Sequence, residues 1–228
     1  MQNDFDDEMN SNNGEVEVEI ELSPSSELAL PSANLPKQIY LLPLSERPFF
    51  PAQTQPLLMN GKPWMETVSK IGDTEDHMVG LFMTQPHDSE FASPEDYSEI
   101  GTLARMHHPM KQEKKIQFIA EGIQRARIVR WLSDTPPYLV EVEYPQQTEP
   151  RKKDEAKAFA MAIINTLREL IPLNPLYGEE LRFFLDRFSP NEPSALTDFA
   201  ASLTTATPED LQKILETLNI KRRMKQVH

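Results

Sequence analysis

The sequence predicts an α+β protein in which a β-rich part, with six strands and one short helix, precedes an all-α helical bundle. Apolar residues recur with a period near two, in short runs bounded by Pro and Gly, up to residue 149, and with a period near 3.6 beyond it. The short runs lie too close together for repeated βαβ units, so we expect one compact sheet curled into a barrel. Three segments follow: an acidic tail at 1–35, a β-rich part at 36–149 and a helical part at 150–228.

The first 35 residues differ from the rest in charge. They contain nine acids and no Lys or Arg, and because the whole chain has a net charge of −13, only −4 remains for residues 36–228. Few large apolar side chains occur in this segment, so we expect a disordered tail. Residues 16–22, VEVEIEL, alternate between apolar and acidic side chains, as a half-buried strand does. They are either part of a solvated tail or a segment that adds to an exposed sheet edge, in this chain or in a partner.

Residues 37–60 predict two short strands joined by a proline-rich crossing. Four prolines fix φ and remove backbone donors, which prevents the two apolar runs from merging into one helix: Pro43, Pro48, Pro51 and Pro56. The connecting loop at 47–51, RPFFP, places two phenylalanines between prolines, whereas loops are usually built from Gly, Asn, Asp and Ser. The two rings either plug the end of a barrel or are displayed to an apolar partner.

The other elements of the β-rich part follow from local patterns. A short helix is predicted at 63–71, with proline in its first turn and Gly72 after its end. An almost uninterrupted apolar run at 77–84 is typical of a strand covered on both sides, and residues 85–98 predict a polar surface loop. Gly122 permits a bend or a bulge. Four further strand candidates are present at 99–108, 115–122, 124–132 and 138–144.

Four amphipathic helices are predicted after residue 150. The apolar stripe of the first runs from Ala156 to Ile171, and Pro172 ends it. Pro175 starts the second helix, Ser194 caps the third and Thr207 starts the fourth. Burial of each large apolar side chain contributes about 1.5–3 kcal/mol, so four such stripes can hold a bundle together.

The residues exclude several classes of enzyme. The chain has no cysteine, which removes thiol catalysis and thiolate zinc sites and fits a reducing compartment. An ATP-binding P-loop requires Gly-Lys-Ser/Thr, but Gly61-Lys62 is followed by Pro63. The G-x-S-x-G motif of serine hydrolases is also missing from the sequence. We therefore expect no catalytic residue and no bound cofactor in this chain.

Weaker site candidates have simpler interpretations. His107 and His108 are adjacent on a predicted strand and should point to opposite faces, which disfavours a metal site. Glu141 and Glu143 share a strand face, but their alternation with valines indicates a solvated face rather than a general acid and base. Because the sequence has no apolar run of about 18 residues and an acidic balance that repels phosphate, we expect a soluble cytoplasmic protein that binds neither membrane nor nucleic acid.

Five stretches, in order along the chain, resemble the amino-terminal substrate-binding region of bacterial Lon, an ATP-dependent serine protease: LPLSERPFFP at 42–51, GTLARMHH at 101–108, FIAEGIQRARIVRWL at 118–132, YLVEVEYP at 138–145 and residues 170–203. The resemblance implies a PUA-like pseudo-barrel followed by helices. In Lon, similar sequence continues into an ATPase domain that uses ATP and Mg²⁺ and into a protease domain with catalytic Ser and Lys, and neither is in this chain. Residues 220–228 keep a helical pattern without a stop signal, so the chain looks cut there. A homo-oligomer formed through the full-length protein is also implied.

The remaining role is binding, and three hypotheses describe it. The first is recruitment of unfolded or degron-bearing proteins to a Lon protease that degrades misfolded and regulatory proteins. The second is a stand-alone adaptor or ligand-binding protein with the same domain, and RNA binding is a third possibility that the acidic balance opposes. Recruitment needs exposed apolar side chains on a rigid frame. The best candidates surround the proline-rich crossing: Phe49, Phe50, Pro51, Pro56, Leu58 and Met59.

Overall fold

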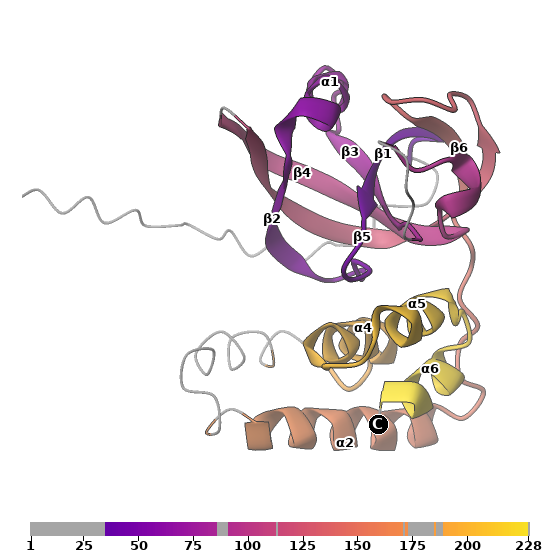
Figure 1. Cartoon of the computed structure of the whole chain (residues 1–228). Helices are drawn as coiled ribbons and strands as arrows, with labels where there is room; N and C mark the ends of the chain where they lie inside the picture. Colours follow the sequence, from indigo (N-terminus) through magenta and orange to yellow (C-terminus); the bar gives the residue numbers. More distant parts are fainter. Residues whose placement is uncertain are drawn as a thin grey trace, which may run out of the picture.

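The computed structural model describes residues 35–85, 91–112, 114–170, 172, 185 and 189–227. Apart from Leu35 and Leu185, the predicted acidic tail and the helix predicted after Pro175 lie outside these residues. In the described part, a β-rich layer sits on a layer of helices (Figure 1). None of the described helices is long and apolar enough to cross a membrane.

Six strands form one mixed sheet, as the sequence predicts. Their order is β2-β5-β4-β3-β1-β6, and β6 also pairs with β5, so that five strands close a ring and β2 extends it. Only β1 and β3 run parallel, while the other neighbours are antiparallel. The strands are β1 (Gln38–Leu44), β2 (Thr54–Asn60), β3 (Met78–Met83), β4 (Ile100–Gln112), β5 (Lys115–Trp131) and β6 (Leu139–Glu143).

The long strand β5 organises the ring. The sequence predicts two strands at 115–122 and 124–132, but they are one continuous strand of 17 residues, so that prediction is wrong. A register shift next to Gly122 interrupts the pairing without ending the strand: Gly122 pairs with Ala104, the neighbouring pair is Leu103 with Gln124, and Ile123 is left without a partner in β4. The irregularity predicted at Gly122 is therefore confirmed. The first half of β5 pairs with β2 and the second half with β6.

The short helix α1 (Gly61–Gly72) packs on one end of the sheet. It begins two residues before the predicted start, because the chain turns directly from β2 into the helix. Trp64, Val68 and Ile71 are buried, so the predicted apolar face is confirmed. In the predicted polar loop at 85–98, a short 3₁₀ turn covers Pro94–Asp96 and Tyr97 is buried; residues 86–90 lie outside the described part.

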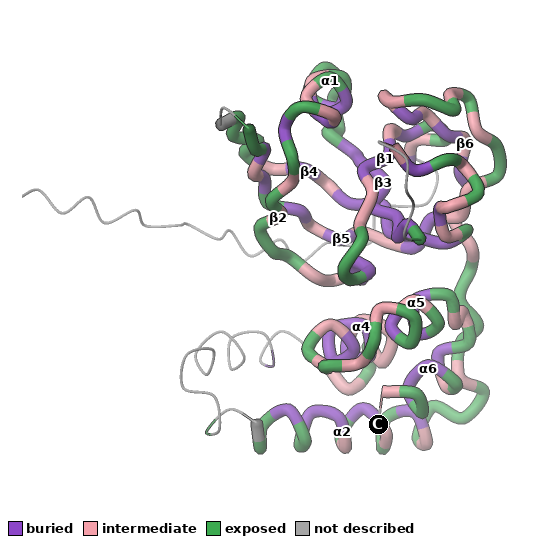
Figure 2. The backbone as a smooth tube through the Cα atoms, in the orientation of Figure 1, coloured by how far each residue is buried: buried purple, intermediate pink, exposed green. Residues whose placement is uncertain are grey.

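The helical layer contains α2 (Lys153–Leu170), α4 (Pro193–Leu203), α5 (Pro208–Glu216) and α6 (Ile220–Val227). Thr207 caps α5 as predicted, since its hydroxyl oxygen accepts the N–H of Asp210. The predicted cap at Ser194 is wrong. Because Pro193 already stands in the first turn of α4, Ser194 lies inside the helix, and its hydroxyl donates to the side chain of Gln147. Buried positions run along β3, β4 and β5 and along the side of α2 that faces the other helices (Figure 2).

An apolar interface joins the two layers. Phe50 from the proline-rich crossing and Ile100 from β4 pack against α4 and α5, where they meet Ala201, Leu211, Ile214 and Leu215. The Arg47 guanidinium donates to the carbonyls of Ser202 and Thr204 at the end of α4, at 3.1 and 2.9 Å. A cation at a helix C-terminus is favourable because the helix dipole is negative there. The crossing is thus held between the sheet and the helices.

A buried ion cluster reinforces this interface. Arg125 in β5 makes two hydrogen bonds of 2.7 Å to the carboxylate of Asp198 in α4. Arg223 in α6 lies 3.1 Å from the same carboxylate, and all three side chains are at most 2 % exposed. Burial lowers the pKa of Arg223 to about 10 while Asp198 opposes that shift, so the guanidinium is charged at neutral pH. The cluster therefore ties three elements from both layers to one carboxylate.

Gly122→Ala should destabilise the fold, because the chain passes close to another backbone at this point. A Cβ at residue 122 would lie 2.4 Å from the carbonyl oxygen of Phe50. Because this oxygen belongs to the backbone, it can move away only if the proline-rich crossing shifts with it. We expect a loss of about 1–3 kcal/mol in the free energy of unfolding, measured with urea. Gly72→Ala is the control, since a Cβ there has no atom within 4 Å. Equal effects of the two substitutions would contradict the close approach.

Asp198→Asn should destabilise the protein strongly, because it leaves two buried guanidiniums without a counter-charge. Loss of one partner from a buried ion pair costs about 3–5 kcal/mol, and urea unfolding followed by circular dichroism measures the effect. Glu141→Gln serves as the comparison, because Glu141 pairs with Arg130 at 2.8 Å on the surface, where such pairs contribute about 0–1 kcal/mol. A change as small as that of Glu141→Gln would argue against the cluster as a major source of stability.

Candidate functional site

The structure separates the six predicted binding residues into two groups. Phe49 and Phe50 are 2 % and 0 % exposed, and Pro51 is also buried. The prediction that these three residues are displayed to a substrate is therefore wrong, and the alternative, that the rings plug the barrel, describes them. The physical reason is packing. Phe49 lies in the barrel core, and Phe50 fills the interface between the barrel and the helical layer at α5.

The other three residues lie on β2. Pro56 and Leu58 are exposed, with 58 % of Leu58 open to solvent, while Met59 is half-buried and packs against the barrel core. Because side chains alternate along a strand, Pro56 and Leu58 share the outer face and Met59 points to the opposite one. Contact between these three residues and a substrate remains a prediction, and the geometry favours Pro56 and Leu58.

Two residues that sequence reasoning did not select complete this surface. Ile119 in β5 pairs with Pro56, and it is 39 % exposed. Gln117 in β5 pairs with Leu58 on one side and with Met110 of β4 on the other, and Met110 is 54 % exposed. We call these four residues the outer-face patch: Pro56, Leu58, Met110 and Ile119.

The sequence pattern indicated an outward-facing position for one of these two residues, Ile119. Along β5, Ile119 alternates with the buried residues Phe118 and Ala120, in step with polar Gln117 and Glu121, so the period of two already placed it away from the core. Met110 gave no such signal, because the register of β4 shifts between His107 and Met110. That shift brings Met110 onto the outer face beside Leu58.

Polar groups border the patch at one end. His107 pairs with Ile119 across the sheet, and its Nε2 lies 2.8 Å from a carboxylate oxygen of Glu121. Arg105 lies 3.9 Å from the same oxygen. His108, whose φ is 49°, sits in the shifted part of β4 and is exposed. Within the described residues, no three His, Asp or Glu side chains gather to hold a metal ion.

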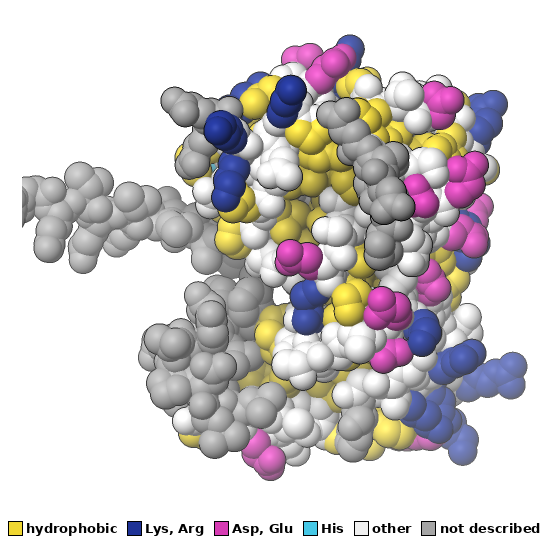
Figure 3. Space-filling model, viewed as in Figure 1, with side chains coloured by type: hydrophobic (Ala, Val, Ile, Leu, Met, Phe, Trp, Pro, Cys, Tyr) yellow, Lys and Arg dark blue, Asp and Glu magenta, His cyan; other side chains and the backbone are white. Residues whose placement is uncertain are grey.

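Lysines border the opposite end of the patch. Lys115 starts β5 across from Asn60, Lys62 lies at the start of α1, and the amine of Lys111 donates to the hydroxyl of Ser69 at 2.8 Å. Together with Lys114 they are all exposed. Cationic side chains gather over this end of the β-rich layer, at the β4–β5 turn and the start of α1 (Figure 3). The exposed apolar surface thus lies between a mixed polar border and a basic border.

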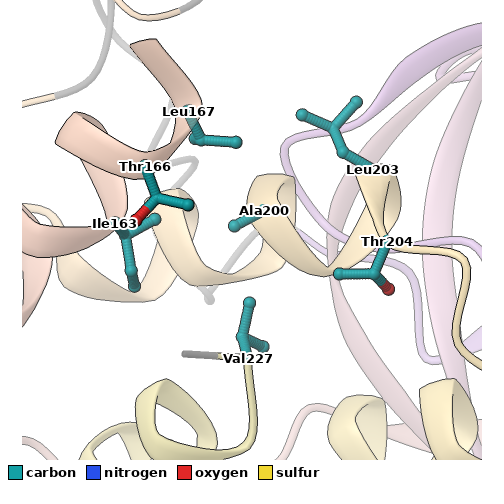
Figure 4. A pocket seen from close by; sticks show the side chains of 7 residues that line it. All are labelled: Ile163, Thr166, Leu167, Ala200, Leu203, Thr204 and Val227. Carbon is teal, nitrogen blue, oxygen red and sulfur yellow. The ribbon is translucent and has the colours of Figure 1, made fainter. Parts of the chain in front are cut away.

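The helical layer contains a separate apolar hollow (Figure 4). It has a volume of about 130 Å³, whereas pockets for drug-sized ligands span about 300–1,000 Å³. The hollow is therefore too small for a ligand of that size. Its lining comes from α2, α4, the residue after α4 and the end of α6: Ile163, Thr166, Leu167, Ala200, Leu203, Thr204 and Val227.

Comparison with known proteins gives the family. Residues 38–228 match the family of the ATP-dependent protease La (LON) substrate-binding domain. Lon protease 2 of Hydrogenovibrio crunogenus is 42% identical over 205 residues, which are 90% of this chain and 23% of that protein. Lon protease of Chlamydia trachomatis is 32% identical over 220 residues, which are 95% of this chain and 26% of that protein. The chain spans about a quarter of the length of these relatives.

Solved structures share the fold. The N-terminal domain of Mycobacterium avium complex Lon protease gives a TM-score of 0.66 at 18% identity and covers 84% of this chain and 96% of its own. The Lon N-terminal domain protein from Xanthomonas campestris gives 0.54 at 17% identity, with 83% and 96% covered. These likenesses concern the fold, while the match over residues 38–228 is one of sequence and spans most of the chain. The chain belongs to the family of Lon substrate-binding domains.

Proposed function

We propose that this chain recruits unfolded or degron-bearing proteins to a Lon protease and holds them at the outer-face patch. The observation that carries this proposal is the set of apolar side chains that the described residues leave exposed on three paired strands, with Leu58 and Met110 more than half open to solvent. Exposed apolar surface of this kind marks sites of interaction. The family match supports the assignment of a substrate-binding role.

The patch suits a binder of many sequences. Full burial of one large apolar side chain is favourable by about 1.5–3 kcal/mol, so a few partly exposed side chains provide weak binding that depends on hydrophobicity rather than on one motif. Because the side chains stand on a hydrogen-bonded sheet, little conformational entropy of the protein is lost on contact. Weak binding by one chain becomes strong when several chains act together in an oligomer.

The proposal extends to the parent protein. We further propose that the chain is the substrate-recognition and assembly region of an ATP-dependent serine endopeptidase that uses ATP and Mg²⁺, forms a homo-oligomer and works in the cytoplasm. In this chain the role is binding rather than catalysis, and its partners are proteins rather than nucleic acids or membranes. The closed ring of five strands supports a PUA-like pseudo-barrel, and the packing of α2 with α4 and α6 supports a helical bundle that begins near residue 150.

Leu58→Ser combined with Met110→Ser should weaken binding of a permanently unfolded protein about tenfold or more, because both substitutions remove apolar area from the patch. Both side chains are exposed, so stability should change by less than about 0.5 kcal/mol per site. Fluorescence anisotropy of a labelled, unfolded substrate measures the affinity. The native form of the same substrate is measured in parallel and should bind more weakly.

A matched control for this experiment is Val129→Ser. Val129 is 58 % exposed on the other half of β5, away from β2, so its removal tests loss of surface hydrophobicity in general. Affinity should stay within a factor of two. Equal losses from the control and the double variant, or an unchanged affinity of the double variant, would refute the assignment of the patch.

A further inference from the structure

The strand β2 has one open edge in the described structure. It pairs with β5 on one side and stands at the end of the strand order, so no described strand lies on its other side. The hydrogen bonds at its two ends show which backbone groups face β5: the N–H of Gly61 donates to Lys114, and the carbonyl of Gln53 accepts from Gly122. Alternation in an antiparallel ladder then directs the odd-numbered residues of β2 toward β5. The backbone groups of Thr54, Pro56, Leu58 and Asn60 face away.

The position of Pro56 is consistent with this orientation of the β2 backbone. Proline lacks an N–H and occurs in sheets where that group would not enter the ladder, which on an edge strand is the open side. The open edge therefore presents the N–H donors of Thr54, Leu58 and Asn60 together with the carbonyls of Thr54, Pro56 and Leu58, because the carbonyl of Asn60, the N-cap of α1, belongs to the first turn of that helix. The exposed side chain of Leu58 lies beside them. Proteins normally cover or interrupt such edges because they attract further strands.

We propose that residues 16–22 of this chain add to the open edge of β2 as a further strand. In VEVEIEL the apolar residues at 16, 18, 20 and 22 fall on one face of an extended chain and the acids at 17, 19 and 21 on the other. The surface beside the edge offers both apolar and cationic side chains. The outer face of β2 carries Pro56 and Leu58, while Lys62 and Lys111 belong to the side of the sheet on which α1 packs.

Charge favours this segment over a general apolar peptide. Residues 1–35 carry nine acids and no base, and the lysines at the β4–β5 turn and the start of α1 are exposed beside the end of β2. The acids at 17, 19 and 21 are therefore attracted to the lysines at this end of β2.

The connecting chain is long enough for this contact. Thirteen residues separate Leu22 from Pro36, and Leu35 is already buried in the barrel core. Fully extended, thirteen residues span about 43–47 Å. A folded part of about 110 residues has a diameter of about 35 Å. The segment can therefore reach β2 from the point where the chain enters the barrel.

Hydrogen exchange on the full chain tests the proposal. In the wild type, the amides of Thr54, Leu58 and Asn60 should exchange at least tenfold more slowly than in the variant Val18→Pro/Ile20→Pro, because each proline removes a donor and prevents strand pairing. The control Ser11→Pro/Asn13→Pro places the same change outside the segment and should leave the protection intact. Amides of Leu57 and Met59, which bond to β5, report on the integrity of β2 and should not change.

Two outcomes would overturn the proposal. Equal exchange at Thr54, Leu58 and Asn60 in the wild type and in Val18→Pro/Ile20→Pro would show that the segment does not cover the edge. Protection that disappears on dilution of the wild-type protein would assign the edge to the tail of a second copy rather than to the chain's own segment. Protection in the wild type that is independent of concentration and falls in high salt supports the intramolecular strand, because the Lys–Glu attraction is screened.

Discussion

The placement of the helices on the barrel depends on one carboxylate, Asp198, held between two guanidiniums where water does not reach. Removal of three charges from water is expensive, and further hydrogen bonds from both guanidiniums to other acceptors help to offset that cost. Arg125 donates to the carbonyl of Leu215, and Arg223 donates to the carbonyl of Thr217 and to the side chain of Gln147. Since these bonds have strict directions, a shift of α4 or α6 relative to β5 would break several at once. The cluster therefore specifies geometry as well as contributing stability.

This constraint explains why the proline-rich crossing is buried. Once the helices are fixed against β5, the crossing lies between the two layers, and the ring of Phe50 fills the interface. Phe50 is enclosed by residues of α4 and α5, and Arg47 reaches the end of α4 from the same loop. The prolines that make the loop stiff suit a segment that must keep its shape between two surfaces, because a proline loses little conformational entropy on folding. Rigidity here serves packing rather than recognition.

The limits of sequence reasoning follow from the same contacts. Local patterns of apolar residues, prolines and helix-start residues were sufficient to predict β1, β2, β3, α1 and the helix start at Thr207, because each depends on neighbours within a few residues. The burial of Phe50 depends on side chains about 150 residues away, and no local pattern distinguishes a ring that fills an interface from one that faces a partner. The continuity of β5 through Gly122 likewise depends on its pairing with β4. Met110 reached the patch through a register shift that only the paired strand reveals.

The outer-face patch and the open edge of β2 are two aspects of one strand, and together they offer two kinds of contact. In the proposed function, side chains such as Leu58 would contact apolar groups, whereas backbone donors and acceptors would pair with any extended chain, whatever its sequence. An unfolded protein supplies both at once, because its backbone is unpaired and its apolar residues are exposed. A folded protein supplies neither, since its strands are already paired and its apolar residues are inside. A binder built on an edge strand with an apolar outer face would therefore distinguish unfolded from folded chains without reading a particular sequence, and where residues 16–22 occupy the edge, such a substrate would have to displace them.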